Sequence, residues 1–392
     1  MKKLIIRAFM AMSFLLAASP AFFFTTYQLF LVEKGMSILQ ISLINSAFML
    51  SIFILEIPTG AFADSFGRRR SVVLGCLTLG TSFLIYYFSN NLIAFILAEI
   101  IGALGHTFIS GALEAWVVDS LRWHKIEISL EEIFRREERI KQTGIFIGSF
   151  TGALIGAHSL AWPWLFCSAG VFIAAAGATF LLKVQHFSQL IFNFHWRTLY
   201  QVSRDSWQSG RSNPSFLRIV LISAALAMSV QALNMQWAIL FREGFKMPMW
   251  IMGLIFSGIA LSAALGANLA PFTARKNTQE GRGLAIAFLI IGPMMIFSGQ
   301  ANAFWPAILF FLIHEFGRGL FGPLKKAIVN RRIHGKNRAT MLSLESMFVH
   351  AGAFVGLLTG GWLGNYYSIS TAWTASGVLL LLIAPWLFKK GI

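Results

Sequence analysis

Charged side chains are scarce in this sequence. Only 12% of its 392 residues are Asp, Glu, Lys or Arg, whereas 56% are hydrophobic. A soluble domain of this length needs a charged shell, and so few charges exclude one. Apolar runs recur along the chain, and about 20 such residues are enough to cross about 30 Å of hydrocarbon. The sequence therefore predicts a polytopic helical membrane protein.

Cysteine is nearly absent as well. Cys76 and Cys167 fall within predicted spans and form neither a C-x-x-C pair nor a metal-ligand spacing, so we interpret them as small packing residues. The sequence also lacks the GxxxxGK[ST] loop that binds ATP phosphates. No nucleophile–base pair or metal cluster occurs in the spans, and no soluble receptor domain is apparent. We therefore expect no enzyme activity, no cofactor and no bound metal.

Twelve apolar spans are predicted, and they divide six and six. Their residues are 7–32, 37–63, 71–89, 92–121, 140–160, 162–183, 215–241, 248–272, 283–300, 302–328, 338–364 and 368–388. The start of the chain mimics a signal peptide, but its apolar character continues past any cleavage point. We predict an all-α fold of two six-helix bundles, residues 1–183 and 215–392, joined by a cytoplasmic linker, residues 184–214. The linker is either a surface helix with an apolar stripe or a disordered segment.

Basic residues are concentrated in alternate connections. With the N-terminus inside, all but four of the 32 Lys and Arg lie in cytoplasmic segments, the exceptions being Lys34, Arg242, Lys246 and Arg318. This distribution is typical of multi-pass proteins, whose basic loops remain in the cytoplasm. The net charge of +16 thus reports orientation in the lipid bilayer, and we expect no nucleic-acid partner. Both termini are predicted on the cytoplasmic side of the cell inner membrane.

A short charged connection follows the second span and has a weak internal copy. "GAFADSFGRRRS" (60–71) is echoed by "GANLAPFTARKN" (266–277) after the eighth span, where Ala270 replaces Asp64. Internal repeats in a twelve-span chain are typical of two-bundle secondary transporters. The pattern GxxxDxxGRRR, which runs from Gly60 to Arg70, resembles the loop motif of the major facilitator superfamily. That resemblance implies the fold predicted above. It does not identify the cargo, because one fold serves many cargoes.

The motif has two interpretations. Gly60 and Gly67 permit close approach of helix ends and a tight turn. The resemblance implies that Arg68 and Arg69 form a charge cluster with Asp64 and with Asp119, at the end of span four, which latches helices in the outward-facing state. The alternative is a plain anchor, in which the arginines only hold the loop in the cytoplasm.

Ionisable residues inside the spans are the candidates for proton coupling or substrate binding, because an ionised group near the bilayer centre costs about 3 kcal/mol or more. They are Glu56, Glu99, His106, Glu114, His314, Glu315, Arg318, Glu345 and His350. Glu114 is our first choice, since it lies five residues before Asp119 and so about 7.5 Å deeper. The resemblance implies that span four lines the central cavity. The alternative is a carboxyl hydrogen-bonded to a neighbouring helix.

The other candidates leave alternatives open. Glu56 lies beside Pro58, which frees a backbone carbonyl. In "HEFGRG", Glu315 and Arg318 are three residues apart, so they either neutralise each other or open into a cavity, where Arg318 suits an anionic group. The fifth position of this stretch is Arg318, which excludes the H-E-x-x-H zinc motif. His106 and His350 could relay protons, although packing histidines are commoner.

Four glycines in the fifth span are each four residues apart: Gly144, Gly148, Gly152 and Gly156. This spacing predicts a groove for close helix contact. The resemblance implies that spans five and eight meet between the two halves, and dimerisation through the groove is the alternative. The proline and arginine that drug:proton antiporters carry in spans five and four are missing, and Glu99 lies in the latter region.

We expect a monomeric secondary active transporter that moves a small organic solute by proton-coupled efflux, as an antiporter. The alternative is proton-coupled import of a metabolite or siderophore-like anion. In that case Arg318 would bind the cargo, and Glu114 or Glu315 would carry the proton.

Overall fold

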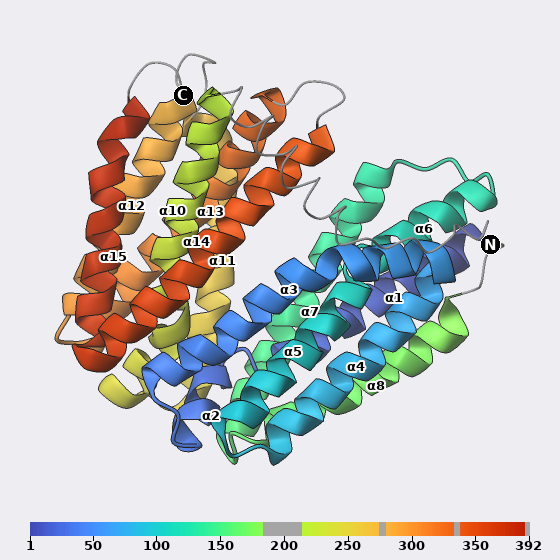
Figure 1. The fold of residues 1–392 in the computed structure, drawn as a ribbon, viewed down its shortest axis with the longest axis horizontal. Coiled ribbons are helices and arrows are strands. Elements are labelled where there is room, and N and C mark those ends of the chain that lie inside the picture. The colour runs from blue at the N-terminus through green and yellow to red at the C-terminus, as the bar shows by residue number, and fades with distance from the viewer. Residues whose placement is uncertain (183–213, 274–279, 333–337, 389–392) are drawn as a thin grey trace. The chain divides into compact units, whose positions relative to one another are not determined.

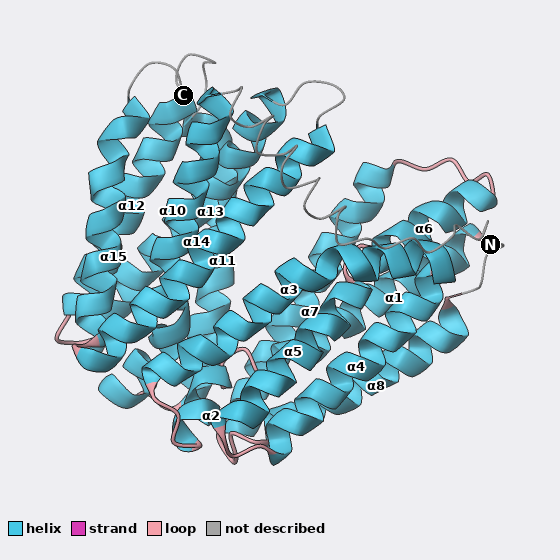
Figure 2. Ribbon diagram, in the orientation of Figure 1, coloured by secondary structure: helices cyan, strands magenta, loops and turns pink. Residues whose placement is uncertain are grey.

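The described part of the chain is helical and contains no strand (Figure 2). A computed structural model describes residues 1–182, 214–273, 280–332 and 338–388. This confirms the predicted all-α class. All but the last residue of the predicted linker, 184–214, lie outside the described residues, so its two alternatives remain predictions.

Two compact units make up the chain (Figure 1). Unit 1 comprises Met1–Met36, Ala47–His195 and Pro248–Gly253, and unit 2 comprises Ser37–Ser46, Trp196–Met247 and Leu254–Ile392. The main boundary between them falls in the stretch that is not described.

The helices follow one another with short connections. Up to the undescribed stretch they are α1 (Lys2–Ala21), α2 (Tyr27–Glu33), α3 (Ile38–Phe66), α4 (Arg68–Phe88), α5 (Leu92–Ile109), α6 (Ala112–Trp123), α7 (Leu130–Gly156) and α8 (Trp162–Leu181). After it come α10 (Pro214–Ile239), η1 (Leu240–Gly244), α11 (Met249–Thr273), α12 (Glu280–Gln300), α13 (Phe304–Arg332), α14 (Arg338–Tyr366), α15 (Ile369–Ile383) and η4 (Ala384–Phe388).

Within the described residues, 11 helical stretches are long and apolar enough to cross a membrane. The predicted fifth span is the exception, because α7 begins at Leu130, before the predicted residue 140, and its first half is rich in charge. The Ser129 side chain caps this helix by accepting a hydrogen bond from the Glu132 backbone N–H at 3.3 Å. The charged half of α7 thus continues directly into the apolar half.

Two predicted spans are each broken into two helices. In the first span, α1 ends just after Pro20, and the chain becomes helical again as α2 at Tyr27. The fourth span breaks between α5 and α6 at Gly111, whose φ of +69° is a left-handed conformation that favours glycine. These two spans are therefore interrupted within the predicted residues, and the backbone conformation is the reason.

Each unit is built by packing its own helices. In unit 1, α1 packs on α7 and α8, and α4 packs on α5 and α8. In unit 2, α10 packs on α14 and α15, and α12 packs on α13 and α15. Aromatic and aliphatic side chains fill the space between them, for example Phe216, Phe288 and Phe321 in unit 2. These contacts place the charged residues described next.

Candidate functional site

Three residues of the predicted latch meet in unit 1. Arg68, in the first turn of α4, forms an ion pair with Asp64 on α3. Its Nε lies 3.9 Å from Oδ2 of Asp119 on α6. Gly67 makes this possible, because it turns the chain between α3 and α4 with a φ of +99°. The cluster Asp64–Arg68–Asp119 therefore joins three helices through one guanidinium, and we call it the latch cluster.

Two predicted members do not join the latch cluster. Arg69 instead donates a hydrogen bond to the backbone carbonyl of Thr179 on α8, at 2.5 Å. Gly60 lies inside α3, and no described atom would come within 4 Å of a Cβ placed there, so it makes no close approach. The reason is that α3 stays helical up to Phe66, so the tight turn falls only at Gly67.

Glu114 is not the isolated acid that its place in the sequence suggests. It lies in the first turn of α6, and its Oε1 is 3.1 Å from Nζ of Lys141 on α7. Lys141 also binds Glu137 at 2.7 Å, and the buried Glu137 carboxylate accepts a hydrogen bond from Ser13 on α1. This network compensates the charge of Glu114 with Lys141, which lies at the start of the predicted fifth span.

A second charged group lies in unit 2, on α13 and α10. The Nη1 atom of Arg318 donates to Oε1 of Glu315 at 2.8 Å and to Oδ1 of Asn234 at 2.9 Å. Glu315 is buried, and Nδ1 of the fully buried His314 lies 3.4 Å from the same Glu315 oxygen. Of the two alternatives for Glu315 and Arg318, the structure shows mutual neutralisation.

The remaining candidates are dispersed. Glu345 on α14 forms an ion pair with Lys325 on α13 at 2.6 Å. His350 bonds to the backbone carbonyl of Ser346, one turn earlier in its own helix, at 2.7 Å. The ring of His106 meets that of Phe48 edge to face, with centroids 5.9 Å apart. Glu56 is exposed on α3.

Glu99 is the embedded acid whose surroundings are the most unusual. Its Oε1 accepts hydrogen bonds from the Tyr27 hydroxyl on α2 at 2.7 Å and from the Tyr86 hydroxyl on α4 at 2.5 Å. The ring of Trp164 on α8 stacks on Tyr86, with centroids 4.0 Å apart. Four helices thus contribute to the surroundings of one carboxyl group.

The glycine groove of α7 faces α1. A Cβ at Gly144 would lie 3.1 Å from the carbonyl oxygen of Phe14, and one at Gly148 or Gly152 would collide with the carbonyl of Ala18 or Phe22. A Cβ at Gly156 would lie 2.6 Å from the Thr26 side chain. Close contact is therefore made as predicted: Gly144 and Gly148 meet α1 of the same unit, and Gly152 meets Phe22 just after it. The eighth span also touches α7, because a Cβ at Gly253 of α11 would lie 3.0 Å from the Ala153 side chain.

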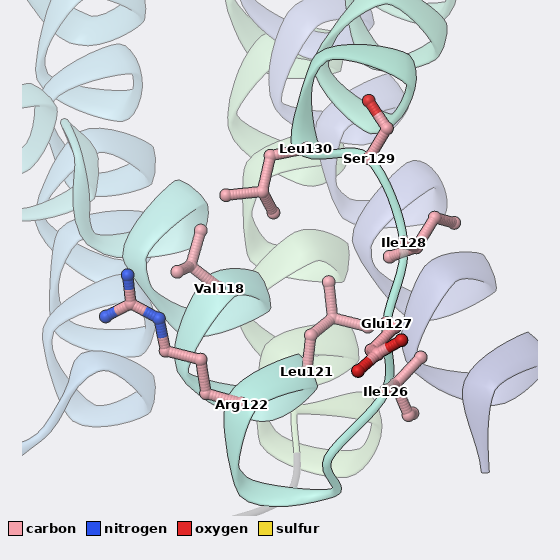
Figure 3. Close-up of a pocket in the computed structure, with 8 residues that line it drawn as sticks. All are labelled: Val118, Leu121, Arg122, Ile126, Glu127, Ile128, Ser129 and Leu130. Atoms are coloured by element: carbon pink, nitrogen blue, oxygen red, sulfur yellow. The ribbon is translucent and has the colours of Figure 1, made fainter.

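A hollow of about 510 Å³ lies between the end of α6, the start of α7 and the segment that joins them (Figure 3). Val118 and Leu121 point from α6 toward Leu130, whereas Arg122 points away from the connecting segment. Ile126, Glu127, Ile128 and Ser129 complete its lining. None of the embedded acids contributes to it, so we do not assign it to the cargo.

Comparison with known proteins identifies the family. The sequence model of the Major Facilitator Superfamily matches residues 8–321. The chain belongs to this superfamily. Its members are transporters and not enzymes, so the predictions of a membrane-spanning transporter without enzyme activity are confirmed at that level.

Individual relatives are distant. The chain is 20% identical over 363 residues to the quinolone resistance protein NorA of Staphylococcus aureus, covering 92% of this chain and 90% of NorA. It is 29% identical over 138 residues to multidrug resistance protein 2 of Bacillus subtilis, covering 35% of this chain but only 34% of that protein. A crystal structure of the nucleoside transporter NupG superposes with a TM-score of 0.81 over 98% of both chains, at 16% identity. At this identity the superposition shows the fold alone.

Several residues of these groups were not predicted from the sequence. Lys141 could have been found, because Glu137 and Lys141 are four residues apart on one helix and this spacing favours an ion pair. Tyr27, Tyr86 and Asn234 carry no such signal, since each lies on another helix than its partner, at a separation that no helical period relates.

Proposed function

We propose that this transporter exports a small organic solute across the cytoplasmic membrane in exchange for protons. The observation that carries the proposal is the bonding of Arg318 to Glu315 and Asn234. A guanidinium that already neutralises a buried carboxylate offers little net charge to an anionic cargo. This weighs against import of an anion and favours a neutral or cationic solute.

One further observation supports export. The relatives that resemble the chain include a quinolone resistance protein and a multidrug resistance protein. Names of distant relatives suggest a cargo class and a direction of transport, and both need a direct test.

The test is energised efflux of the fluorescent lipophilic cation ethidium. Cells that express the chain are expected to lose ethidium several-fold faster than empty cells, and an uncoupler should return the rate to that of empty cells, because no proton gradient then remains to drive the exchange. Equal rates in expressing and empty cells would refute export of such a cation. Uptake of an organic anion that Arg318→Gln abolishes would then establish the importer alternative.

We also propose that residues 1–183 and 215–392 act as N-terminal and C-terminal bundles in alternating access, in a monomer with both termini in the cytoplasm. The latch cluster would stabilise one of the two states, since one arginine shared by two acids on other helices holds their ends together.

A further inference from the structure

The Glu99 site combines a buried acid with two hydroxyl donors. Only 8% of Glu99 is exposed, and the values for Tyr27 and Tyr86 are 6% and 2%. Both hydroxyls converge on the same carboxylate oxygen, at 2.7 and 2.5 Å. Such short O–H···O distances are typical of hydrogen bonds to an ionised carboxylate. The geometry therefore suits the charged form of Glu99.

No cation compensates that charge in the described residues, where none of the ion pairs includes Glu99. The titratable groups that face it are Tyr27 from α2 and Tyr86 from α4, while α8 contributes the non-titratable Trp164. This distinguishes Glu99 from Glu114, Glu315 and Glu345. A buried carboxylate without a cation is held in its charged form by its hydrogen bonds alone, against a burial that favours the neutral form.

The surroundings also exclude a larger ligand. The Trp164 ring lies between those of Tyr86 and Phe23, with centroids at 4.0 and 4.7 Å. Phe30 and Phe95 close the site with fully buried rings that meet edge to face. Side chains packed in this way leave space for a proton but not for an organic solute.

The hydrogen bond between Tyr27 and Glu99 joins two interrupted spans. Tyr27 is the first residue of α2, which follows the break in the first span, and Glu99 lies on α5, which precedes the break in the fourth. Helices that are interrupted within the membrane have ends that can shift separately from the rest of the span. Breaking or weakening the bond between Tyr27 and Glu99 could therefore shift the helix ends beside these interruptions.

We propose that Glu99 is the proton-binding residue of this transporter, with Tyr27 and Tyr86 as positioning residues that hold its ionised form. A proton from the aqueous phase adds to the carboxylate and gives a neutral carboxyl group, and the same proton leaves later on the other side. Its addition removes the charge that strengthens both tyrosine bonds, so the tie between α2, α4 and α5 weakens. This inference rests on the proposed proton-coupled export.

The test compares driven transport with exchange in liposomes that contain the purified full-length protein. Glu99→Gln keeps an oxygen that accepts from both tyrosines but cannot take up the proton. Ethidium transport driven by a pH gradient is expected to fall at least about tenfold, whereas ethidium exchange without a gradient should remain within about threefold of the unmodified protein. Glu243→Gln, which alters an exposed acid paired with Lys246, is the matched control and should change neither rate.

The positioning role has its own measurement. Tyr86→Phe removes a donor to the ionised carboxylate, so the pH profile of driven transport should move to higher pH. Trp164→Phe, which keeps both donors, should leave the profile in place. A profile that is the same in Tyr86→Phe and in the unmodified protein would show that this tyrosine only packs.

Three outcomes would overturn the inference. If Glu99→Gln shows driven transport at the unmodified rate, Glu99 is not the proton carrier. If the variant loses exchange as well as driven transport, Glu99 has a structural role. The third is independent of the cargo: infrared difference spectra between about pH 5 and pH 9 should show a titrating carboxyl band that Glu99→Gln lacks. If this band is absent in the unmodified protein, the inference fails whether or not the protein exports ethidium. If the band is present and ethidium is not moved, only the proposed export fails.

Discussion

At the scale of single residues, the embedded charges are tolerated because nearly all of them have partners. Glu114, Glu315 and Glu345 each meet a basic side chain from the same or a neighbouring helix, and Glu99 meets two hydroxyls. A charge within a membrane span is costly unless it is paired or hydrogen-bonded. The sequence identified these acids as functional candidates. Their pairing in the structure separates the acids neutralised by a basic side chain from Glu99, which has no such partner among the described ion pairs.

The latch cluster leads to a prediction at this scale. Arg68→Ala removes the shared partner of Asp64 and Asp119, so the state that the cluster stabilises should lose population. Coupling energies of 1–3 kcal/mol are typical, which corresponds to a rate of ethidium efflux at least about fivefold lower. The measurement is the initial efflux rate per molecule of folded transporter in the membrane.

Arg70→Ala is the matched control, because Arg70 lies in the same first turn of α4, is exposed and would contribute equally to a plain cytoplasmic anchor. Its rate should stay within about twofold of the unmodified protein. Equal losses in the two variants would favour the anchor interpretation over the latch.

At the scale of elements, helix contacts in both units depend on glycine grooves. The glycines of α7 lie against α1, and Gly352, Gly356 and Gly360 of α14 lie against α10 in the same way. The first and fifth spans of one half thus correspond to the seventh and eleventh of the other, and the internal repeat is visible in packing as well as in sequence. The spacing predicted a close contact but could not tell which helix makes it, because any smooth neighbour would fit the groove.

A substitution in the groove tests the contact. In an open helix, Gly→Ala stabilises by about 1 kcal/mol. At Gly148 the added Cβ would collide with the Ala18 carbonyl, and overpacking of this kind costs about 1–3 kcal/mol. Gly148→Ala should therefore lower the free energy of unfolding in detergent by about 1–2 kcal/mol, as measured by denaturant titration.

Gly60→Ala provides the comparison, since no described atom lies within 4 Å of its new Cβ and its backbone is helical. It should leave the free energy of unfolding unchanged or raise it by up to about 1 kcal/mol. A Gly148→Ala variant as stable as Gly60→Ala would contradict the close packing of α7 on α1.

At the scale of the whole molecule, orientation follows from where the basic residues lie. Lysine and arginine are nearly confined to alternate connections, and basic loops resist transfer across the membrane during insertion. In the proposed orientation, Glu33 lies outside and His124 lies in the cytoplasm. Both are exposed, so each can be replaced by cysteine to report its side of the membrane.

Labelling with a membrane-impermeant maleimide tests this orientation. The variants are built on a chain in which the fully buried Cys76 and Cys167 are replaced by alanine. Glu33→Cys is expected to react in intact cells, and His124→Cys only after the membrane is made permeable. The cysteine-free chain should not react, and the opposite labelling pattern would reverse the proposed topology.

Hydropathy and charge are local properties, so the amino-acid sequence was enough to predict a polytopic helical membrane protein, the approximate positions of its spans and its embedded acids. It also supplied the motif that indicates the superfamily. The partners of these residues become visible in the folded chain: Lys141 for Glu114, α1 for Gly144 and Gly148 of α7, and Tyr27 and Tyr86 for Glu99. Each partner comes from a different helix. Which helices become neighbours depends on packing that no contiguous pattern records.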